Sequence, residues 1–329
     1  MKVLITGGAG FLGRRLAERL LQRGALTGPR GEEPIDRIML LDVVEGARLD
    51  DPRVEQIAGD IADRSLLESV IDARTASIFH LAAIVSGMAE TDFDIGMRVN
   101  LDATRTLLDV CRGRGHRPRF VFTSSVAVFG GSLPNPVPES ITLNPQTSYG
   151  TQKAIAELLV NDYSRRGFVD GRSLRLPTIS VRPGKPNAAA SSFASGIIRE
   201  PLNGVEAICP VGRDARMWLL SPRTVIESLI AGHELPAEAF GSDRAVSLPG
   251  ISVTVGEMVD ALERVAGREI AGRIRWEHDP RIHKMVMGWP GAIDTPRARA
   301  LGFASDESFE AMIRQYIEEN APVVKTPPT

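Results

Sequence analysis

A tyrosine and a lysine four residues apart, Tyr149 and Lys153, follow a serine-rich segment that ends at Ser125. On a helix this spacing places both side chains on one face. An ammonium beside a phenol favours the phenolate, so the pair could act as a general base while Ser125 donates a hydrogen bond to the reacting oxygen. A Tyr–Lys pair alone is more often a surface contact, and Ser124 is a rival for the donor role. The chemistry therefore needs support from a second motif.

A glycine-rich segment near the start of the chain gives that support. The apolar run 2–6 is followed by Gly7, Gly10 and Gly13 and then by apolar residues at helical spacing. Such a turn between strand and helix lets the backbone approach a pyrophosphate, while the helix N-terminus offers free N–H groups. We therefore expect a dinucleotide phosphate site on this turn, with Phe11 and Leu12 in contact with the cofactor.

An acidic residue follows at the end of the next strand of this pattern. Asp42 closes the apolar run 37–42, further from the glycines than the usual spacing of ~20 residues, because the segment 27–34 is an insertion. Its carboxylate would accept hydrogen bonds from ribose hydroxyls and repel a 2′-phosphate, so NAD is expected rather than NADP. The alternative is a residue that only caps the strand end.

Composition limits the partners. The chain has 329 residues, 43% hydrophobic and 24% charged, with a formal net charge of −2, which is typical of a globular protein and favours neither nucleic acid nor an anionic membrane. Two cysteines without metal or disulfide spacing indicate a reducing compartment, and no signal peptide or membrane-spanning run is recognised, so we expect the cytoplasm. Histidines without metal-site spacing predict no metal.

Strand-like and helix-like periods alternate through the first half of the chain. This alternation predicts an α/β protein with a Rossmann-type, doubly wound parallel sheet and a smaller C-terminal substrate-binding region. The NAD-binding domain is expected over 1–176 with a return of about 224–250, and the substrate region over 177–223 and 251–329. The expected strands are 2–6, 36–43, 54–58, 77–82, 118–123 and 173–181, and the expected helices are 11–23, 65–73, 91–113 and 148–166.

These motifs, in this order, resemble the extended short-chain dehydrogenase/reductase family. The resemblance spans essentially the whole chain and includes Gly59-Asp60-Ile61, His80-Leu81-Ala82-Ala83 and Val99-Asn100. It implies Ser125, Tyr149 and Lys153 as catalytic residues, with His80 and Cys111 as core residues. The cofactor-binding residues that it implies are Gly7, Gly10, Phe11, Leu12, Gly13, Asp42, Asp60, Ile61, Leu81, Ala82, Ala83, Asn100, Tyr149, Lys153, Pro177 and Thr178.

Runs at 80–87, 148–154, 175–178 and 182–191 are similar to family members that oxidise the C2 hydroxyl of a four-carbon sugar acid to the 2-oxo acid. The Arg-Asp-Phe-x-His-Val-x-Asp segment of many nucleotide-sugar enzymes is reduced here to Arg216, which suits a small anion or equally a plain salt bridge. Which residue pairs the substrate carboxylate stays open. The substrate-binding candidates are Ser86, Ser125, Tyr149, Thr178, Arg182, Asn187, Ser191, Ser192 and Arg216.

Two other functions compete with a sugar-acid dehydrogenase. One is a nucleotide-sugar epimerase or dehydratase that keeps its NAD, and the other is a non-catalytic dinucleotide sensor, which the intact Ser125, Tyr149 and Lys153 disfavour. The resemblance also implies a homodimer through the helices that begin near Asn100 and Tyr149. The apolar residues available for that interface are Leu101, Leu107, Leu108, Ile155, Leu158 and Leu159.

Overall fold

The computed structural model describes residues 1–28, 31–184 and 189–320 of the chain. They form two compact units, each described here by itself. The first unit consists of the described residues of 1–128, 147–175 and 226–246, and the second of those of 129–146, 176–225 and 247–320.

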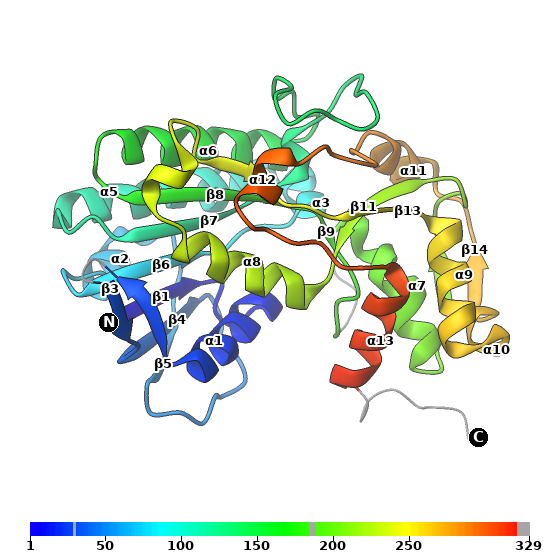
Figure 1. The fold of residues 1–329 in the computed structure, drawn as a ribbon, viewed down its shortest axis with the longest axis horizontal. Helices are drawn as coiled ribbons and strands as arrows, with labels where there is room; N and C mark the ends of the chain where they lie inside the picture. Colours follow the sequence, from blue (N-terminus) through cyan, green and yellow to red (C-terminus); the bar gives the residue numbers. More distant parts are fainter. Residues whose placement is uncertain (29–30, 185–188, 321–329) are drawn as a thin grey trace. The chain divides into compact units, whose positions relative to one another are not determined.

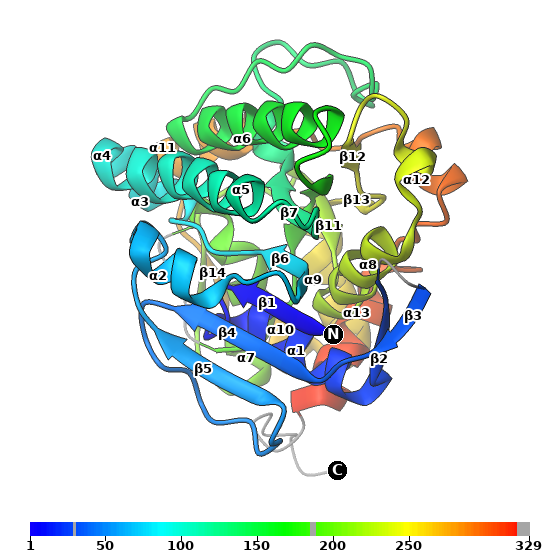
Figure 2. The same cartoon turned by 90° about the vertical axis from the view of Figure 1, so that its left-hand side faces the viewer.

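A sheet of seven strands is the centre of the first unit (Figures 1 and 2), in the order β12-β8-β7-β6-β1-β4-β5. β1 pairs in parallel with β4 and β6, and these pair in parallel with β5 and β7. The carboxyl ends of these strands therefore lie at one edge, and the predicted fold class is confirmed. The strands are β1 (Lys2–Thr6), β4 (Arg37–Asp42), β5 (Val54–Ala58), β6 (Thr75–His80), β7 (Arg119–Ser125), β8 (Asp170–Leu176) and β12 (Ala245–Ser247).

Helices cover both faces of this sheet because alternate strand residues are apolar on each side. Leu4, Ile78 and Phe120 point to one face, where they form one buried cluster with apolar side chains of α2, α5 and α6. Figure 2 shows α5 and α6 side by side there. α1 buries Leu16 and Leu20 outside that cluster. The helices are α1 (Phe11–Arg23), α2 (Arg64–Val70), α5 (Ala103–Arg114), α6 (Ser148–Arg165) and α8 (Pro222–Glu234).

Three expected elements differ in the structure. The insertion forms an antiparallel hairpin of β2 (Ala25–Gly28) and β3 (Gly31–Pro34). The single helix expected over 91–113 is divided into α3 (Ser86–Thr91), α4 (Phe93–Gly96), a π-helical turn (Met97–Asp102) and α5. The strand expected over 173–181 is interrupted at Pro177, which has no N–H to donate to a ladder.

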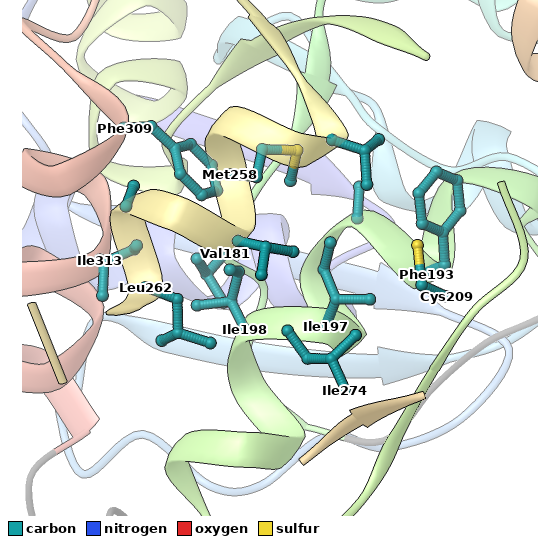
Figure 3. Close-up of a cluster of buried hydrophobic side chains, with 14 of the residues drawn as sticks. Val181, Phe193, Ile197, Ile198, Cys209, Met258, Leu262, Ile274, Phe309 and Ile313 are labelled. Carbon is teal, nitrogen blue, oxygen red and sulfur yellow. The ribbon is translucent and has the colours of Figure 1, made fainter. Parts of the chain in front are cut away.

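The second unit has a three-stranded sheet, in the order β13-β11-β9, and a parallel pair, β10 with β14. Its core, shown in part in Figure 3, joins Ile197 and Ile198 of α7, Met258 of α9 and Ile313 of α13. Its elements are β9 (Thr178–Ile179), β10 (Ala207–Cys209), β11 (Arg216–Leu220), β13 (Ile251–Thr254), β14 (Ile274–Trp276), α7 (Phe193–Leu202), α9 (Val255–Ala266), α10 (Arg268–Ala271), α11 (Pro280–Met287), α12 (Pro296–Ala300) and α13 (Phe309–Asn320).

The start of α9 and the end of β10 are both fixed locally. Thr254 is the N-cap of α9 and forms a capping box with Glu257. Cys209 ends strand β10 and is fully buried. Both cysteines are buried free thiols.

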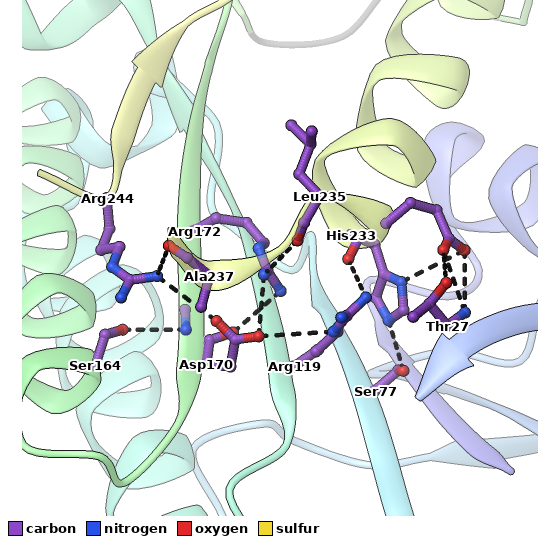
Figure 4. Close-up of polar contacts among 12 residues, drawn as sticks. Thr27, Ser77, Arg119, Ser164, Asp170, Arg172, His233, Leu235, Ala237 and Arg244 are labelled. Carbon is purple, nitrogen blue, oxygen red and sulfur yellow. Dashed lines mark hydrogen bonds and ion pairs between the residues drawn. The ribbon is translucent and has the colours of Figure 1, made fainter. Parts of the chain in front are cut away.

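A buried polar cluster lies in the first unit (Figure 4), where β7 and β8 begin. Asp170 of β8 pairs with Arg172 at 3.1 Å, and Arg119 and Arg244 each lie 3.6 Å from its carboxylate. Nearby, His233 of α8 stacks on Phe79 of β6 with ring centroids 5.3 Å apart. Its Nε2 lies 2.7 Å from the hydroxyl of Ser77.

Two buried histidines oppose protonation. Burial, with Lys153 nearby, lowers the pKa of His80 from 6.5 to about 3, and burial lowers that of His233 from 6.5 to about 4 despite the Glu234 carboxylate. The unfolded chain therefore binds more protons between these values and 6.5, so falling pH destabilises the fold from about pH 6.5 downward.

We predict that acidification to pH ~4.5 removes roughly 2–3 kcal/mol of unfolding free energy per buried histidine. Other groups also titrate, so the contribution of His233 is measured as a difference. Urea unfolding of the wild type and of His233→Gln at pH ~7.5 and ~4.5 should show a smaller acid loss in the variant. Equal losses in the two proteins would contradict a neutral buried His233.

Candidate active site

The glycine turn after β1, residues 7–13, allows a ligand to approach the backbone closely. Gly7 has φ +72°, and a Cβ there would lie 2.9 Å from the backbone nitrogen of Ala82. A Cβ on Gly13 would lie 2.2 Å from the carbonyl oxygen of Gly7. Gly10 is the N-cap of α1, and no side chain caps its first turn. The helix N-terminus therefore presents backbone N–H groups to a phosphate, so these residues fit a dinucleotide.

Asp42 stands beside this turn at the end of β4. One carboxylate oxygen accepts a hydrogen bond from the backbone N–H of Ala9 at 3.1 Å, and the other accepts from Val43 at 2.8 Å. Despite the insertion, Asp42 therefore reaches the glycine turn. It also caps its own strand end, so the two interpretations of this residue are compatible. A carboxylate has about four lone-pair sites, which leaves acceptor capacity for ribose hydroxyls.

Asp60 and Ile61, expected to bind the cofactor, follow β5. Ile61 is buried, and Asp60 pairs with Arg98 at 2.5 Å while accepting from the N–H of Ala62 at 2.9 Å. The hydrogen bond from Arg98 holds the pKa of Asp60 below its usual value. Arg98 was not among the predicted residues, because the pairing joins positions 38 residues apart.

The carboxyl end of β6 is fixed by a chain of buried hydrogen bonds. Thr6 lies 2.7 Å from Nδ1 of His80 and accepts from the N–H of Ala82 at 3.2 Å. Nε2 of His80 lies 2.8 Å from the hydroxyl of Thr104 in α5. His80 is thus a core residue, as is Cys111. The chain of bonds sets the backbone path of 81–83, where the cofactor is expected.

Asn100 lies in the π-helical turn and is buried. Its side chain accepts from the N–H of Ile84 at 2.8 Å and donates to the carbonyl of Ile84 at 3.1 Å. It also donates to the side chain of Gln152 at 2.7 Å. Asn100 therefore braces the backbone after β6 and ties it to α6. Such π-helical turns frequently occur at functional sites.

Tyr149, Lys153 and Ser125 come together where β7 ends and α6 begins. The Nζ of Lys153 lies 5.6 Å from the ring centroid of Tyr149 and 4.6 Å from that of Phe122, and it donates to the carbonyl of Thr123 at 2.8 Å. Ser125 donates a hydrogen bond that stabilises the Tyr149 phenolate. The spacing of the tyrosine and lysine thus places them on one face of α6, with the serine beside them.

Burial acts on both titrating groups of this site. It raises the pKa of Tyr149 to about 12, against the hydrogen bond from Ser125. It lowers the pKa of Lys153 to about 7, and only the Glu157 carboxylate acts in the opposite direction on this lysine. A base at this tyrosine therefore needs additional positive charge near the phenol.

The two neighbouring serines differ in their partners. Ser124 is buried and donates to the carboxylate of Glu157, whereas Ser125 is half-buried and faces Tyr149. This contact occupies Ser124 and favours Ser125 as the donor. The sequence did not single out Glu157, although its position four residues after Lys153 on the same helix was a signal for it.

The N-terminus of α6 is held from another element. Thr147 is its N-cap and accepts from the N–H of Gly150, and the carboxylate of Glu90 in α3 accepts from the N–H of Ser148. Ser86, a substrate candidate, is the first residue of α3 and is half-buried. Glu90, which the sequence analysis missed, therefore fixes the turn that carries Tyr149.

The remaining candidates belong to the second unit. Thr178 pairs with Leu219 between β9 and β11, after Pro177. Arg182 is half-buried, and no acidic group lies within ion-pair distance of it among the described residues. Arg216 is exposed, with Nη1 3.3 Å from the hydroxyl of Ser252. Ser191 and Ser192 lie in a 3₁₀ turn, and Asn187 lies outside the described residues.

Fold and site together define a nicotinamide dinucleotide-dependent oxidoreductase. The family model described as the NAD dependent epimerase/dehydratase family matches residues 3–221. The chain belongs to this family, which confirms the resemblance to the extended short-chain dehydrogenases/reductases.

Individual relatives agree with this assignment. The chain is 60% identical to a D-erythronate dehydrogenase of Cupriavidus necator, over 97% of this chain and 98% of the relative. It is 48% identical to a D-erythronate dehydrogenase of Haemophilus influenzae, over 97% and 99%. A solved structure described as the nucleoside-diphosphate-sugar epimerase from Agrobacterium tumefaciens matches with a TM-score of 0.92 and 48% identity, covering 98% of this chain and 95% of that one.

Proposed function

We propose that this protein oxidises the C2 hydroxyl of D-erythronate, or of a closely similar four-carbon sugar acid, to the 2-oxo acid with NAD. The main support is the Ser125–Tyr149–Lys153 arrangement in a chain 60% identical, nearly end to end, to a D-erythronate dehydrogenase. NAD supplies the hydride acceptor and, in its oxidised form, a positive charge. The residues of the first unit that would hold it are those of the glycine turn, Asp42, Asp60, Ile61, 81–83 and Lys153.

Tyr149 is the proposed base. Bringing its pKa from about 12 to near 8 requires roughly 5 kcal/mol of differential stabilisation of the phenolate. A charged Lys153, whose Nζ lies 5.6 Å from the centre of the phenol ring, would contribute roughly 3 kcal/mol at an effective dielectric constant near 20. Lys153 would then supply about half of the requirement, and the cofactor's charge is the natural source of the rest.

The proton and the hydride leave the substrate from different atoms. Tyr149 takes the proton of the C2 hydroxyl as the C2–H bond breaks and its electron pair leaves with the hydride, so that the C2 carbonyl forms. Ser125 donates to the reacting oxygen and holds it against Tyr149. Lys153 balances the phenolate charge before the transfer.

A nucleotide-sugar epimerase is the second candidate, because the matched Agrobacterium structure carries that description. Such an enzyme returns the hydride to its substrate, so net NADH formation separates the two. We expect the wild type to release NADH from D-erythronate and Tyr149→Phe to lose several orders of magnitude in kcat while still binding NAD. Turnover of a nucleotide sugar without net NADH would instead support the epimerase.

We infer that Arg182 pairs the substrate carboxylate. Burial lowers its pKa, with Arg199 acting in the same direction, and a carboxylate would supply the counter-charge. Arg216, by contrast, is exposed and already contacts the hydroxyl of Ser252. We predict that Arg182→Met raises KM for the sugar acid by at least about tenfold and that Arg216→Met changes it less than about threefold. A larger increase in KM for Arg216→Met than for Arg182→Met would instead show that Arg216 pairs the carboxylate.

Asp42 supports NAD over NADP, since its carboxylate would repel a 2′-phosphate. We predict that Asp42→Ala lowers kcat/KM with NAD and raises it with NADP, which reduces the preference at least about tenfold. Asp42→Asn, which keeps the shape but not the charge, separates repulsion from hydrogen bonding. If the ratio of kcat/KM with NAD to kcat/KM with NADP stays the same in both variants, a residue other than Asp42 selects the cofactor.

We propose a cytoplasmic homodimer that uses the exposed face of α6. Leu158 is 66% exposed, whereas Leu107 and Leu108 are fully buried in the core and cannot belong to an interface. No helix within the described ranges is long and apolar enough to cross a membrane.

Light scattering should give twice 35.6 kDa for the wild type and a folded monomer for Leu158→Glu. A monomeric wild type would rule the dimer out.

A further inference from the structure

A buried ion pair lies one helical turn beyond Lys153. Glu157 is 4% exposed and Arg175 of β8 is 7% exposed. Arg175 donates to both carboxylate oxygens of Glu157, from Nε at 2.9 Å and from Nη2 at 2.8 Å. Ser124 donates to the same carboxylate. Three hydrogen bonds from two strands thus fix the Glu157 side chain.

Stability alone does not explain this pair. Taking two charges out of water is costly, and well-packed apolar residues of similar volume often serve a fold equally well. Glu157 contacts Ser124, the residue before Ser125 at the end of β7, and lies on the helix that carries Tyr149 and Lys153. Its position points to an electrostatic role in the site.

The groups around Lys153 show what that role is. On α6 it faces the neutral phenol of Tyr149, and on β7 it meets the Phe122 ring and the carbonyl of Thr123. On β6 it faces His80, which stays neutral because burial lowers its pKa to about 3. Among the described residues, Glu157 is therefore the anionic group that favours the ammonium.

We propose that Glu157, held by Arg175 and Ser124, is a positioning residue that keeps Lys153 in its charged form and thereby sets the pH range in which Tyr149 can act as a base. This inference rests on the proposed function only in that the base is Tyr149. Glu157 contacts neither Tyr149 nor Ser125, the two groups that act on the reacting oxygen. It acts through Lys153.

The charge of Glu157 therefore affects the acidic limb of the pH profile. Without it, Lys153 loses its proton at lower pH, and a neutral amine stabilises the Tyr149 phenolate less. The pH at which Tyr149 becomes active as a base then rises. We expect a rise of about one pH unit, because Arg175 already compensates part of the Glu157 charge. Turnover at high pH, where Tyr149 ionises without help, should be affected far less.

The test removes the two charges together, because Glu157→Gln alone would take away the carboxylate that Arg175 pairs with in a buried site. Glu157→Gln with Arg175→Met is compared with Ser124→Ala, which perturbs the same cluster without changing its charge. Circular dichroism first establishes that both variants are folded. We expect the acidic limb of kcat/KM to move to higher pH by about one unit in the double variant and to stay in place in Ser124→Ala.

A direct readout keeps this test independent of the substrate. The chain has five lysines, so ¹³C labelling of the lysine side chains gives few signals, and Lys153→Met assigns that of Lys153. Its titration should move to lower pH in the folded double variant, even if D-erythronate proves not to be a substrate. An unmoved Lys153 titration and an unmoved acidic limb would show that the pair is only structural. If the wild type proves inactive on the sugar acid but the Lys153 titration moves in the double variant, only the proposed function is overturned.

Discussion

The buried ammonium of Lys153 is the charge on which the site depends. It donates to the carbonyl of Thr123, lies against the rings of Phe122 and Tyr149, and loses much of its hydration in doing so. That loss lowers its pKa to about 7, close to the pH at which its charge is needed. A cation held so near neutrality can be adjusted by small changes in its surroundings, which is why a carboxylate one turn away matters.

The parallel sheet explains why these groups meet. β1, β4, β6 and β7 run in the same direction, so Thr6, Asp42, His80 and Ser125 all end strands at one edge of the first unit. The glycine turn begins at the same edge, and the helix after it presents free N–H groups. Hydrogen bonds among Thr6, His80 and Thr104 then hold this edge without introducing a second charge beside Lys153. The neutral His80 is part of that arrangement.

Local patterns in the sequence predicted the parts of the fold and site that depend on neighbouring residues. The glycine turn, the Tyr149–Lys153 spacing and the alternation of strands and helices required only short-range regularities. Contacts between distant positions could not be read in this way. The pairing of Asp60 with Arg98, of Glu157 with Arg175 and of Glu90 with Ser148 depends on how the elements pack, as does the burial of Leu108. The interruption at Pro177 was visible in the sequence, but the apolar pattern on both sides of it favoured one strand.

Direct titration of Tyr149 tests the central claim most closely. The chain has three tyrosines, so ¹³Cζ labelling and the Tyr149→Phe variant identify its signal. Without dinucleotide, Tyr149 should stay protonated to about pH 12, and saturation with NAD should bring its ionisation down by several pH units. In Lys153→Met saturated with NAD, Tyr149 should ionise at a higher pH than in the wild-type complex, because the contribution of Lys153 is lost. A Tyr149 signal that ionises at the same pH with and without NAD would contradict its role as the base.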